Sequence, residues 1–228
     1  MHHAARRNTE RYASRAESDP RYRRDHRERA PKKVGTHLAL FDCLTCDKCI
    51  AACPNDANFA FVVPHLEIAV EKAARHDGRW TTRREGTLHI HERHQIGHFA
   101  DLCNDCGNCD VACPEDGGPQ LMKPRFHGSL EALRADLHGT GVALRRTPDG
   151  YVAHARFERD REVCLRVAGA SARYEGDGFS LRFDPDAIAD TLDGDALGEV
   201  DLTPARILHT LARAVLAPRE VNPVSTLP

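Results

Sequence analysis

Residues 43–54 read CLTCDKCIAACP, and residues 103–114 read CNDCGNCDVACP. Both stretches follow the spacing C-x₂-C-x₂-C-x₃-C-P, which is the bacterial pattern for [4Fe–4S] ligation. The first three cysteines of each group fit on one tight loop and can bind three iron corners of one cube. The fourth cysteine stands before a proline and points away at the start of the next segment. The repeat therefore predicts two [4Fe–4S] clusters.

The fourth cysteine of each group is expected to serve the other cluster, as it does in two-cluster ferredoxins. We therefore assign the eight predicted ligands in crossed sets. Cluster one takes Cys43, Cys46, Cys49 and Cys113, and cluster two takes Cys103, Cys106, Cys109 and Cys53. This crossing predicts a unit with approximate twofold symmetry in which the two cubes lie close together.

Zinc is the main alternative for so many cysteines. Zinc sites usually take two C-x₂-C pairs around one tetrahedral ion. A three-plus-one group that is followed by proline and occurs twice fits zinc poorly, so we favour iron–sulfur clusters over zinc or disulfides. The ninth cysteine, Cys164, lies in an apolar strand pattern outside both groups. We interpret it as a structural thiol.

Histidines and acidic residues also gather near the cysteine groups. The histidines are His89, His91, His94 and His98, and the acidic residues are Asp47, Asp105, Asp110, Glu115 and Asp116. Because no carboxylate or thiol matches the histidine spacing, we interpret the histidines as polar surface or as cover for a cluster. The acidic residues are either solvated surface or a rim that lowers cluster potential and steers a basic partner.

Charge is unevenly distributed along the 228 residues, although the net charge is only −2. Residues 1–33 carry eleven Lys/Arg and five Asp/Glu, and the remainder carries 21 and 29. The basic arm is either a solvated linker or surface helix, or a dock for a partner. No apolar stretch approaches the ~20 residues that span a bilayer, and no signal peptide is recognisable. We therefore expect a cytoplasmic protein with reduced thiols, and neither a nucleic-acid nor a membrane partner.

Composition and the positions of proline residues predict a basic arm or linker over 1–36, a cluster domain over 37–127 and a small domain over 128–228. In the cluster domain, apolar spacing predicts a strand ending at Pro64, a helix over 66–75 ended by Gly78, and a hairpin of two strands around Gly86.

The small domain begins with a helix capped by Ser129. An antiparallel meander follows over 142–183, and the last helix has Thr203 as N-cap, Pro204 as its first residue and Pro218 as its stop. The predicted fold class is α+β: a dicluster ferredoxin-like module with an enlarged insertion, and a small antiparallel sheet-and-helix C-terminal domain.

Nucleotide motifs are not recognisable in the sequence. Gly139-Thr140-Gly141 lacks a third glycine, because Leu144 stands at that position, and no suitable strand precedes it. We therefore predict no flavin or nicotinamide site and no catalytic residue in this chain.

The segment 41–127 resembles a known family. The resemblance rests on four stretches of residues: Phe41 to Phe59, His98 to Cys109, Cys113 to Pro119, and Leu121-Met122-Lys123-Pro124-Arg125-Phe126. It is similar to the C-terminal dicluster ferredoxin segment of the selenate reductase iron–sulfur subunit, which belongs with relatives of the glutamate synthase small chain and dihydropyrimidine dehydrogenase.

This resemblance implies electron flow from NAD(P)H through flavin and the cubes to a redox acceptor such as a molybdenum hydroxylase. It also implies that FAD and NAD(P)H are held by a partner flavoprotein or by a domain upstream of such a segment. The predicted function is single-electron relay through two [4Fe–4S] clusters, as part of an NAD(P)H- and flavin-dependent oxidoreductase. The alternatives are an Fe–S sensor or structural Fe–S protein, and a self-sufficient reductase, which the missing nucleotide motifs disfavour.

Overall fold

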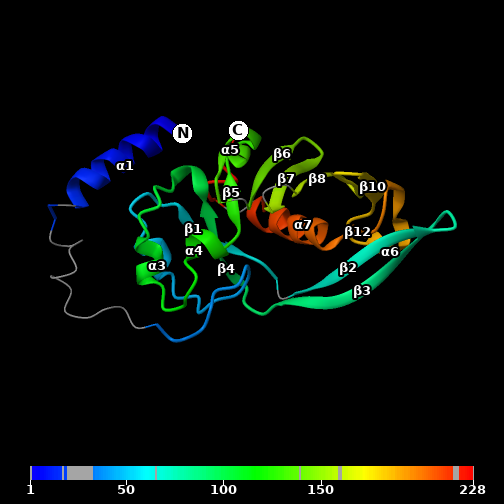
Figure 1. The fold of residues 1–228 in the computed structure, drawn as a ribbon, viewed down its shortest axis with the longest axis horizontal. Helices are drawn as coiled ribbons and strands as arrows, with labels where there is room; N and C mark the ends of the chain where they lie inside the picture. The colour runs from blue at the N-terminus through cyan, green and yellow to red at the C-terminus, as the bar shows by residue number, and fades with distance from the viewer. Residues whose placement is uncertain are drawn as a thin grey trace.

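A computed structural model describes residues 2–16, 18–19, 33–64, 66–138, 140–158, 161–217 and 221–227. Two sheets organise these residues (Figure 1). The larger has nine strands in the order β1-β4-β5-β6-β7-β8-β9-β10-β11, and the smaller has three in the order β12-β2-β3. The fold is therefore mixed α/β, with short helices around the cysteines and one long helix in the C-terminal part.

The large sheet passes from the cysteine region into the C-terminal part without a break. Its strands are β1 (Asn58–Val62), β4 (His94–Phe99), β5 (Arg125–His127), β6 (Gly141–Thr147), β7 (Gly150–Glu158), β8 (Arg161–Ala168), β9 (Ser171–Gly176), β10 (Phe179–Phe183) and β11 (Asp193–Ala196). Strand β5 is parallel to both of its neighbours, and the other pairs are antiparallel. The sheet thus includes strands on both sides of the predicted boundary between residues 127 and 128. The division into two domains there stays a prediction.

The small sheet corrects the predicted helix over 66–75. These residues form strand β2 (Leu66–His76), which pairs along its whole length with β3 (Arg79–Ile90). A bulge between Val70 and Glu71 shifts the alternation by one residue. Apolar positions 66, 68 and 70 are therefore followed by 73, and this broken period of two imitates helical spacing.

The predicted hairpin around Gly86 is also wrong. Gly86 lies inside the continuous strand β3, opposite Val70, and the chain reverses at Asp77-Gly78 instead. Both turn residues have positive φ, of 49° and 79°, which a two-residue hairpin turn requires. The hairpin extends away from the cysteine loops, and β12 (Val200–Asp201) pairs with β2 (Figure 1).

Helix α7 (Thr203–Val215) covers the inner face of the C-terminal sheet. Ile207, Leu208, Leu211 and Val215 are buried there together with Leu165 and Tyr174. The helix starts at Thr203 rather than being capped by it, because Thr203 Oγ1 accepts a hydrogen bond from Glu71 N at 3.2 Å. The side chain thus ties β2 to α7. The predicted stop, Pro218, lies outside the described residues.

Short helices surround the cysteine groups: α2 (Lys48–Ala51), the 3₁₀ turn η3 (Ala100–Leu102), α3 (Asn108–Ala112) and α4 (Pro119–Met122). Helix α5 (Leu130–Ala135) follows β5, and Ser129 caps it by accepting from Ala132 N at 3.1 Å, as predicted. A one-turn helix α6 (Ile188–Thr191) precedes β11.

Part of the predicted basic arm is helical. Helix α1 (His2–Ala16) lies beside the second cysteine group, where Asn108 Nδ2 donates to Tyr12 Oη at 2.8 Å. Residues 20–32, which also belong to the predicted arm, lie outside the described residues. In the described part of the chain, no helix has the length and apolarity needed to cross a membrane.

Candidate metal centre

The two halves of the cysteine region pair crosswise. Strand β1, which follows the first cysteine group, is antiparallel to β4, which precedes the second. Conversely, His37, ahead of the first group, forms a bridge with Asp116, just after the second. Leu38 N donates to Asp116 O at 2.9 Å, and Asp116 N donates to Thr36 O at 2.8 Å. This is the approximate twofold arrangement that crossed ligation needs.

The two cysteine loops share one unusual backbone path. Thr45 and Asp47 have φ of 46° and 54° in the first loop, and Asp105 and Gly107 have 54° and 74° at the matching positions of the second. Such left-handed conformations are uncommon outside glycine, although Asp tolerates them. The repeat thus extends from cysteine spacing to backbone geometry.

This path turns main-chain N–H groups toward the cysteines. Thr45 N donates to Cys43 Sγ at 3.4 Å, and Asp105 N donates to Cys103 Sγ at 3.3 Å. Ala57 N likewise donates to Cys53 Sγ at 3.2 Å. Such donors stabilise negative charge on sulfur, so they suit cysteines that act as thiolate ligands.

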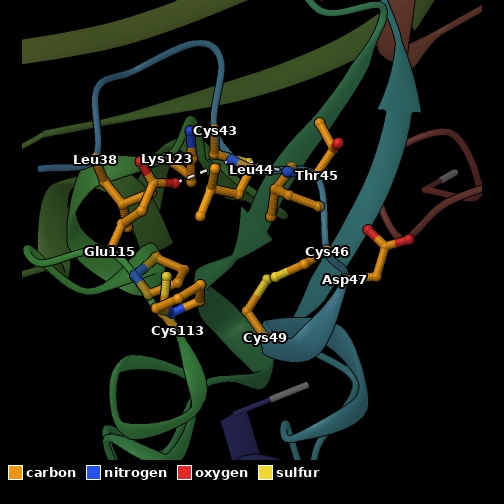
Figure 2. Close-up of a pocket in the computed structure, with 13 residues that line it drawn as sticks. Leu38, Cys43, Leu44, Thr45, Cys46, Asp47, Cys49, Cys113, Glu115 and Lys123 are labelled. Carbon is orange, nitrogen blue, oxygen red and sulfur yellow. Dashed lines mark hydrogen bonds between the residues drawn. The ribbon is translucent and has the colours of Figure 1, made fainter. Parts of the chain in front are cut away.

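Four cysteines line one pocket, and they are the four assigned to cluster one: Cys43, Cys46, Cys49 and Cys113 (Figure 2). The first three come from one loop, and Cys113 comes from the second group, beside Pro114 and Pro119. The pocket encloses about 320 Å³ of empty space, its open mouth included. Its wall combines sulfur with apolar surface from Leu38, Leu44 and Ile96.

Two of these four thiols, Cys49 and Cys113, have raised pKa values and are neutral at physiological pH. Burial, followed by the neighbouring Cys113 and Cys43, raises the pKa of Cys49 to about 12. Burial also raises the pKa of Cys113. Because ligation requires thiolates, the donor set calls for a strong positive counter-charge, which iron would supply. The residues present therefore fit an iron–sulfur cluster.

The four cysteines assigned to cluster two are brought together less completely than those of cluster one. Burial raises the pKa of Cys103 to about 12, and Cys109 lies near enough to add to that rise. Burial raises the pKa of Cys109 as well, and Cys53 contributes to the increase. Cys109 is thus close to both Cys103 and Cys53, so it links a residue of its own loop with one of the other group. Cys106 is partly exposed, and no described contact places it with these three.

Single-ion sites do not match this arrangement. In the residues that the structure describes, no three His, Cys, Asp or Glu side chains converge at the distance of one metal ion. Zinc would need four ligands within about 2.3 Å of one point, whereas thiolates around a cube each bind a different iron.

The histidine tract does not form a common site. His89 lies 3.2 Å from Glu67 and stacks on His91, with ring centroids 5.7 Å apart. His94 Nε2 lies 2.7 Å from Asp47 Oδ1. His98 is buried, and burial, with Arg125 next, lowers its pKa to about 3. His98 is therefore a neutral core side chain beside the second cysteine group.

The acidic residues expected as a rim have distinct roles. Lys33 lies 3.2 Å from Asp110 and 3.8 Å from Asp116. Glu115 is not on the rim: it is buried and accepts hydrogen bonds from Thr36 Oγ1 at 3.0 Å and from Leu44 N at 3.1 Å. It therefore fixes the first cysteine loop to the segment after the second group.

Lys123 is a site residue that sequence reasoning missed. It is 2% exposed, it lines the pocket of Cys43 and Cys49, and Nζ donates to Ala39 O at 3.0 Å and to Asp42 O at 2.5 Å. Burial lowers its pKa, and Cys43 acts in the opposite direction. A buried ammonium at this position would offset the negative charge of a bound cluster.

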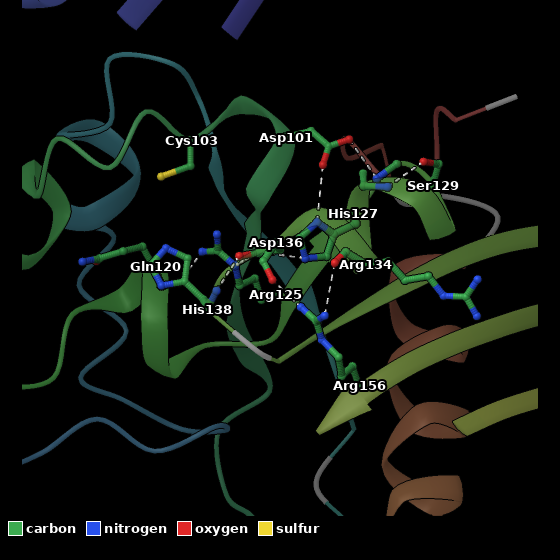
Figure 3. A network of polar contacts seen from close by, with 12 residues as sticks. Asp101, Cys103, Gln120, Arg125, His127, Ser129, Arg134, Asp136, His138 and Arg156 are labelled. Atoms are coloured by element: carbon green, nitrogen blue, oxygen red, sulfur yellow. Dashed lines mark hydrogen bonds and ion pairs between the residues drawn. The ribbon is translucent and has the colours of Figure 1, made fainter. Parts of the chain in front are cut away.

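A buried network of charges lies beside Cys103 (Figure 3). Asp136 Oδ2 is 2.7 Å from Arg125 Nε and 3.1 Å from His127 Nε2, and Asp101 Oδ1 is 3.5 Å from His127 Nδ1. All four side chains are at most 7% exposed. Burial acts to lower the pKa of His127, but the hydrogen bonds that its ring donates to Asp101 and Asp136 outweigh burial and raise that pKa. Nothing in the cysteine spacing predicts this network.

Cys164 lies on β8, opposite His154 and outside both cysteine groups. It is partly buried, and burial raises its pKa.

Comparison with known proteins agrees with this centre. Residues 69–116 match the family described as "4Fe-4S dicluster domain". The matched range includes most of β2, all of β3 and the whole second cysteine group, and it begins after the first group.

Curated relatives match over a short stretch. Over 78 residues, 34% of this chain, the sequence is 31% identical to proteins named "Putative oxidoreductase YgfK" from Escherichia coli strain K12 and from Escherichia coli O157:H7. The stretch spans only 5% of the length of each of these relatives. No solved structure matches the chain. The domain and the relatives support an iron–sulfur electron-transfer role.

Proposed function

We propose that this chain binds two [4Fe–4S] clusters and relays single electrons within an NAD(P)H- and flavin-dependent oxidoreductase. Cys43, Cys46, Cys49 and Cys113 would hold one cluster, and Cys103, Cys106, Cys109 and Cys53 the other. The observation that carries the proposal is Cys113 in the pocket of the first cysteine loop. It is the juxtaposition that crossed ligation requires.

The surroundings of the cysteines favour electron transfer through the clusters over storage of electrons or a purely structural role for the clusters. Each cluster, when bound, accepts or releases one electron. Main-chain donors at Cys43, Cys53 and Cys103 are already in place, so little reorganisation accompanies a change of charge. Cys46 is exposed, which gives a partner a short route to the first cluster.

The electron donor is proposed to be a flavoprotein. Clusters take one electron at a time and cannot accept a hydride, so a flavin normally splits the electron pair. The sequence has no dinucleotide fingerprint to hold either cofactor. The basic helix α1, which lies against the second cysteine group through Tyr12 and Asn108, is part of the proposed dock for that donor.

Anaerobic visible spectroscopy on the cluster-loaded chain tests the proposal. Dithionite should bleach the broad absorbance, and so should NADPH together with a catalytic amount of a flavoprotein reductase. NADPH alone should leave the spectrum unchanged. Bleaching of the flavin-free chain by NADPH alone would mean that the chain holds its own nucleotide site, and the relay assignment would fail. Deleting residues 1–33 should slow reduction through the flavoprotein, more so at low salt, without affecting dithionite reduction.

A further inference from the structure

The outer face of the C-terminal sheet carries a row of arginines that are far apart in sequence. Strand register places Arg145 opposite Val152, Val152 opposite Arg166, Arg166 opposite Arg173, and Arg173 opposite Arg182. Directly opposed residues project from the same side of a sheet, and neighbouring strands are about 4.8 Å apart. Four guanidinium groups therefore share one line across β6 to β10, on the side away from α7.

Such a row is electrostatically unfavourable by itself. Like charges directly opposite each other destabilise a sheet, and three of the four arginines occupy adjacent strands. Arg173 has a counter-charge in Glu175, 3.0 Å away. For Arg145, Arg166 and Arg182, no carboxylate within the described residues lies at ion-pair distance.

A cavity of about 290 Å³ lies at one end of this row, between α5 and strands β6 to β8. Arg145, His154 and Arg166 contribute its polar groups from three adjacent strands. Glu131 lines the cavity too, but its carboxylate is exposed. That carboxylate already accepts hydrogen bonds from its own main-chain N–H and from the side chain of Ser129. The polar wall on the sheet side is thus wholly cationic or hydrogen-bond donating.

The composition and size of the cavity select a class of ligand. Two guanidinium groups on either side of Val152 can each offer a planar pair of N–H donors to the oxygens of a phosphate. His154 is half-buried on the same strand as Val152, two residues further along, and can add a further donor. The volume is at the lower end for small-molecule sites, so it suits a phosphate or diphosphate group rather than a whole dinucleotide.

We propose that this cavity binds the phosphate or diphosphate group of an anionic ligand, held by Arg145 and Arg166. The site is separate from the cysteine centre, yet only α5 stands between them. Ser129 and Leu130 of that segment line the cavity, and Ala132 and Ala135 line the pocket of Cys103. The assignment does not depend on the clusters and can stand if the proposed electron relay fails.

Titration calorimetry on the full cluster-loaded chain tests this site, with inorganic pyrophosphate and ADP as the two probes. We expect saturable binding of at least one probe. Arg145→Gln and Arg166→Gln should each weaken it about tenfold or more, since each removes charge-assisted hydrogen bonds. Arg182→Gln, in the same row but outside the cavity, is the matched control and should bind as the wild type does.

The two probes distinguish the source of the phosphate chemistry. Tighter binding of ADP indicates a nucleotide ligand, and equal or tighter binding of pyrophosphate indicates the diphosphate group alone. Iron content and circular dichroism of each variant confirm that it is folded. Absence of saturable binding for both probes, or an equal loss in Arg182→Gln, would overturn the proposal.

Discussion

The side-chain amide of Asn58 donates a hydrogen bond of 2.9 Å to the main-chain oxygen of Cys49. The same side chain also hydrogen-bonds to Cys109, and its Oδ1 lies 2.8 Å from His98 Nδ1. Asn58 begins β1 directly after the first cysteine group, and His98 belongs to β4 just before the second. One buried amide thus holds the two cysteine loops at a fixed separation, as shared ligation between them requires.

Crossed ligation gives the first prediction. Cys113→Ser should disturb the cluster held by Cys43, Cys46 and Cys49, and Cys53→Ser should disturb the other one. Electron paramagnetic resonance of the dithionite-reduced variants should therefore pair Cys113→Ser with Cys43→Ser. Cys164→Ser is the control and should retain both signals. If Cys53→Ser instead gives the spectrum of Cys43→Ser, the ligand sets are not crossed.

Lys123 should raise the potential of the first cluster. Its buried ammonium lines that pocket, and a positive charge at close range favours the reduced, more negative state. Lys123→Met should lower the potential of that cluster by on the order of 50–100 mV, with a smaller effect on the second. A redox titration followed by paramagnetic resonance measures both potentials.

Two further variants make the Lys123 result specific. Lys123→Arg keeps the charge and should keep most of the potential. Lys48→Met removes an exposed lysine next to Cys49, and screening by solvent should leave the potential within about 20 mV of the wild type. An unchanged potential in Lys123→Met with full iron content would show that the ammonium has no such role.

The buried network beside Cys103 should contribute strongly to stability. Asp136→Asn removes the charge that Arg125 and His127 share, leaving a buried guanidinium without its carboxylate. We expect a loss of about 3 kcal/mol, a fall of roughly 8 °C in the melting temperature of the cluster-loaded chain. Glu162→Gln, which removes the partner of Arg134 in an exposed pair, should change it by less than about 2 °C. Equal falls in melting temperature for Asp136→Asn and Glu162→Gln would contradict a strong contribution of the buried network to stability.

His127 should make part of that stability depend on pH. Its pKa is raised in the folded chain by Asp101 and Asp136, above the unfolded value of about 6.5. The contribution of protonated His127 is therefore complete below that value and is lost as pH rises through the folded pKa. The melting temperature of the wild type should exceed that of His127→Gln most at pH 6, and the gap should narrow toward pH 9. A constant gap would mean that His127 acts only through packing.

Sequence patterns predict strand β1 and the Ser129 cap, and the structure confirms both, because each depends on residues that are near each other in the chain. The strand β2 was mistaken for a helix because one bulge breaks its alternation. Asn58, Lys123 and the Asp136 network have no local signature. They become site residues only when β1 pairs with β4 and β5 joins β4 to β6, which no spacing in the sequence specifies.

Iron and sulfide analysis during redox cycling tests the central claim most directly. The chain, prepared without oxygen, should contain about eight iron and eight sulfide, because each cube holds four of each. Dithionite should bleach the visible absorbance, and an oxygen-free oxidant should restore it with no loss of iron. About four iron per chain, stoichiometric zinc, or release of iron on the first cycle would contradict a two-cluster electron relay.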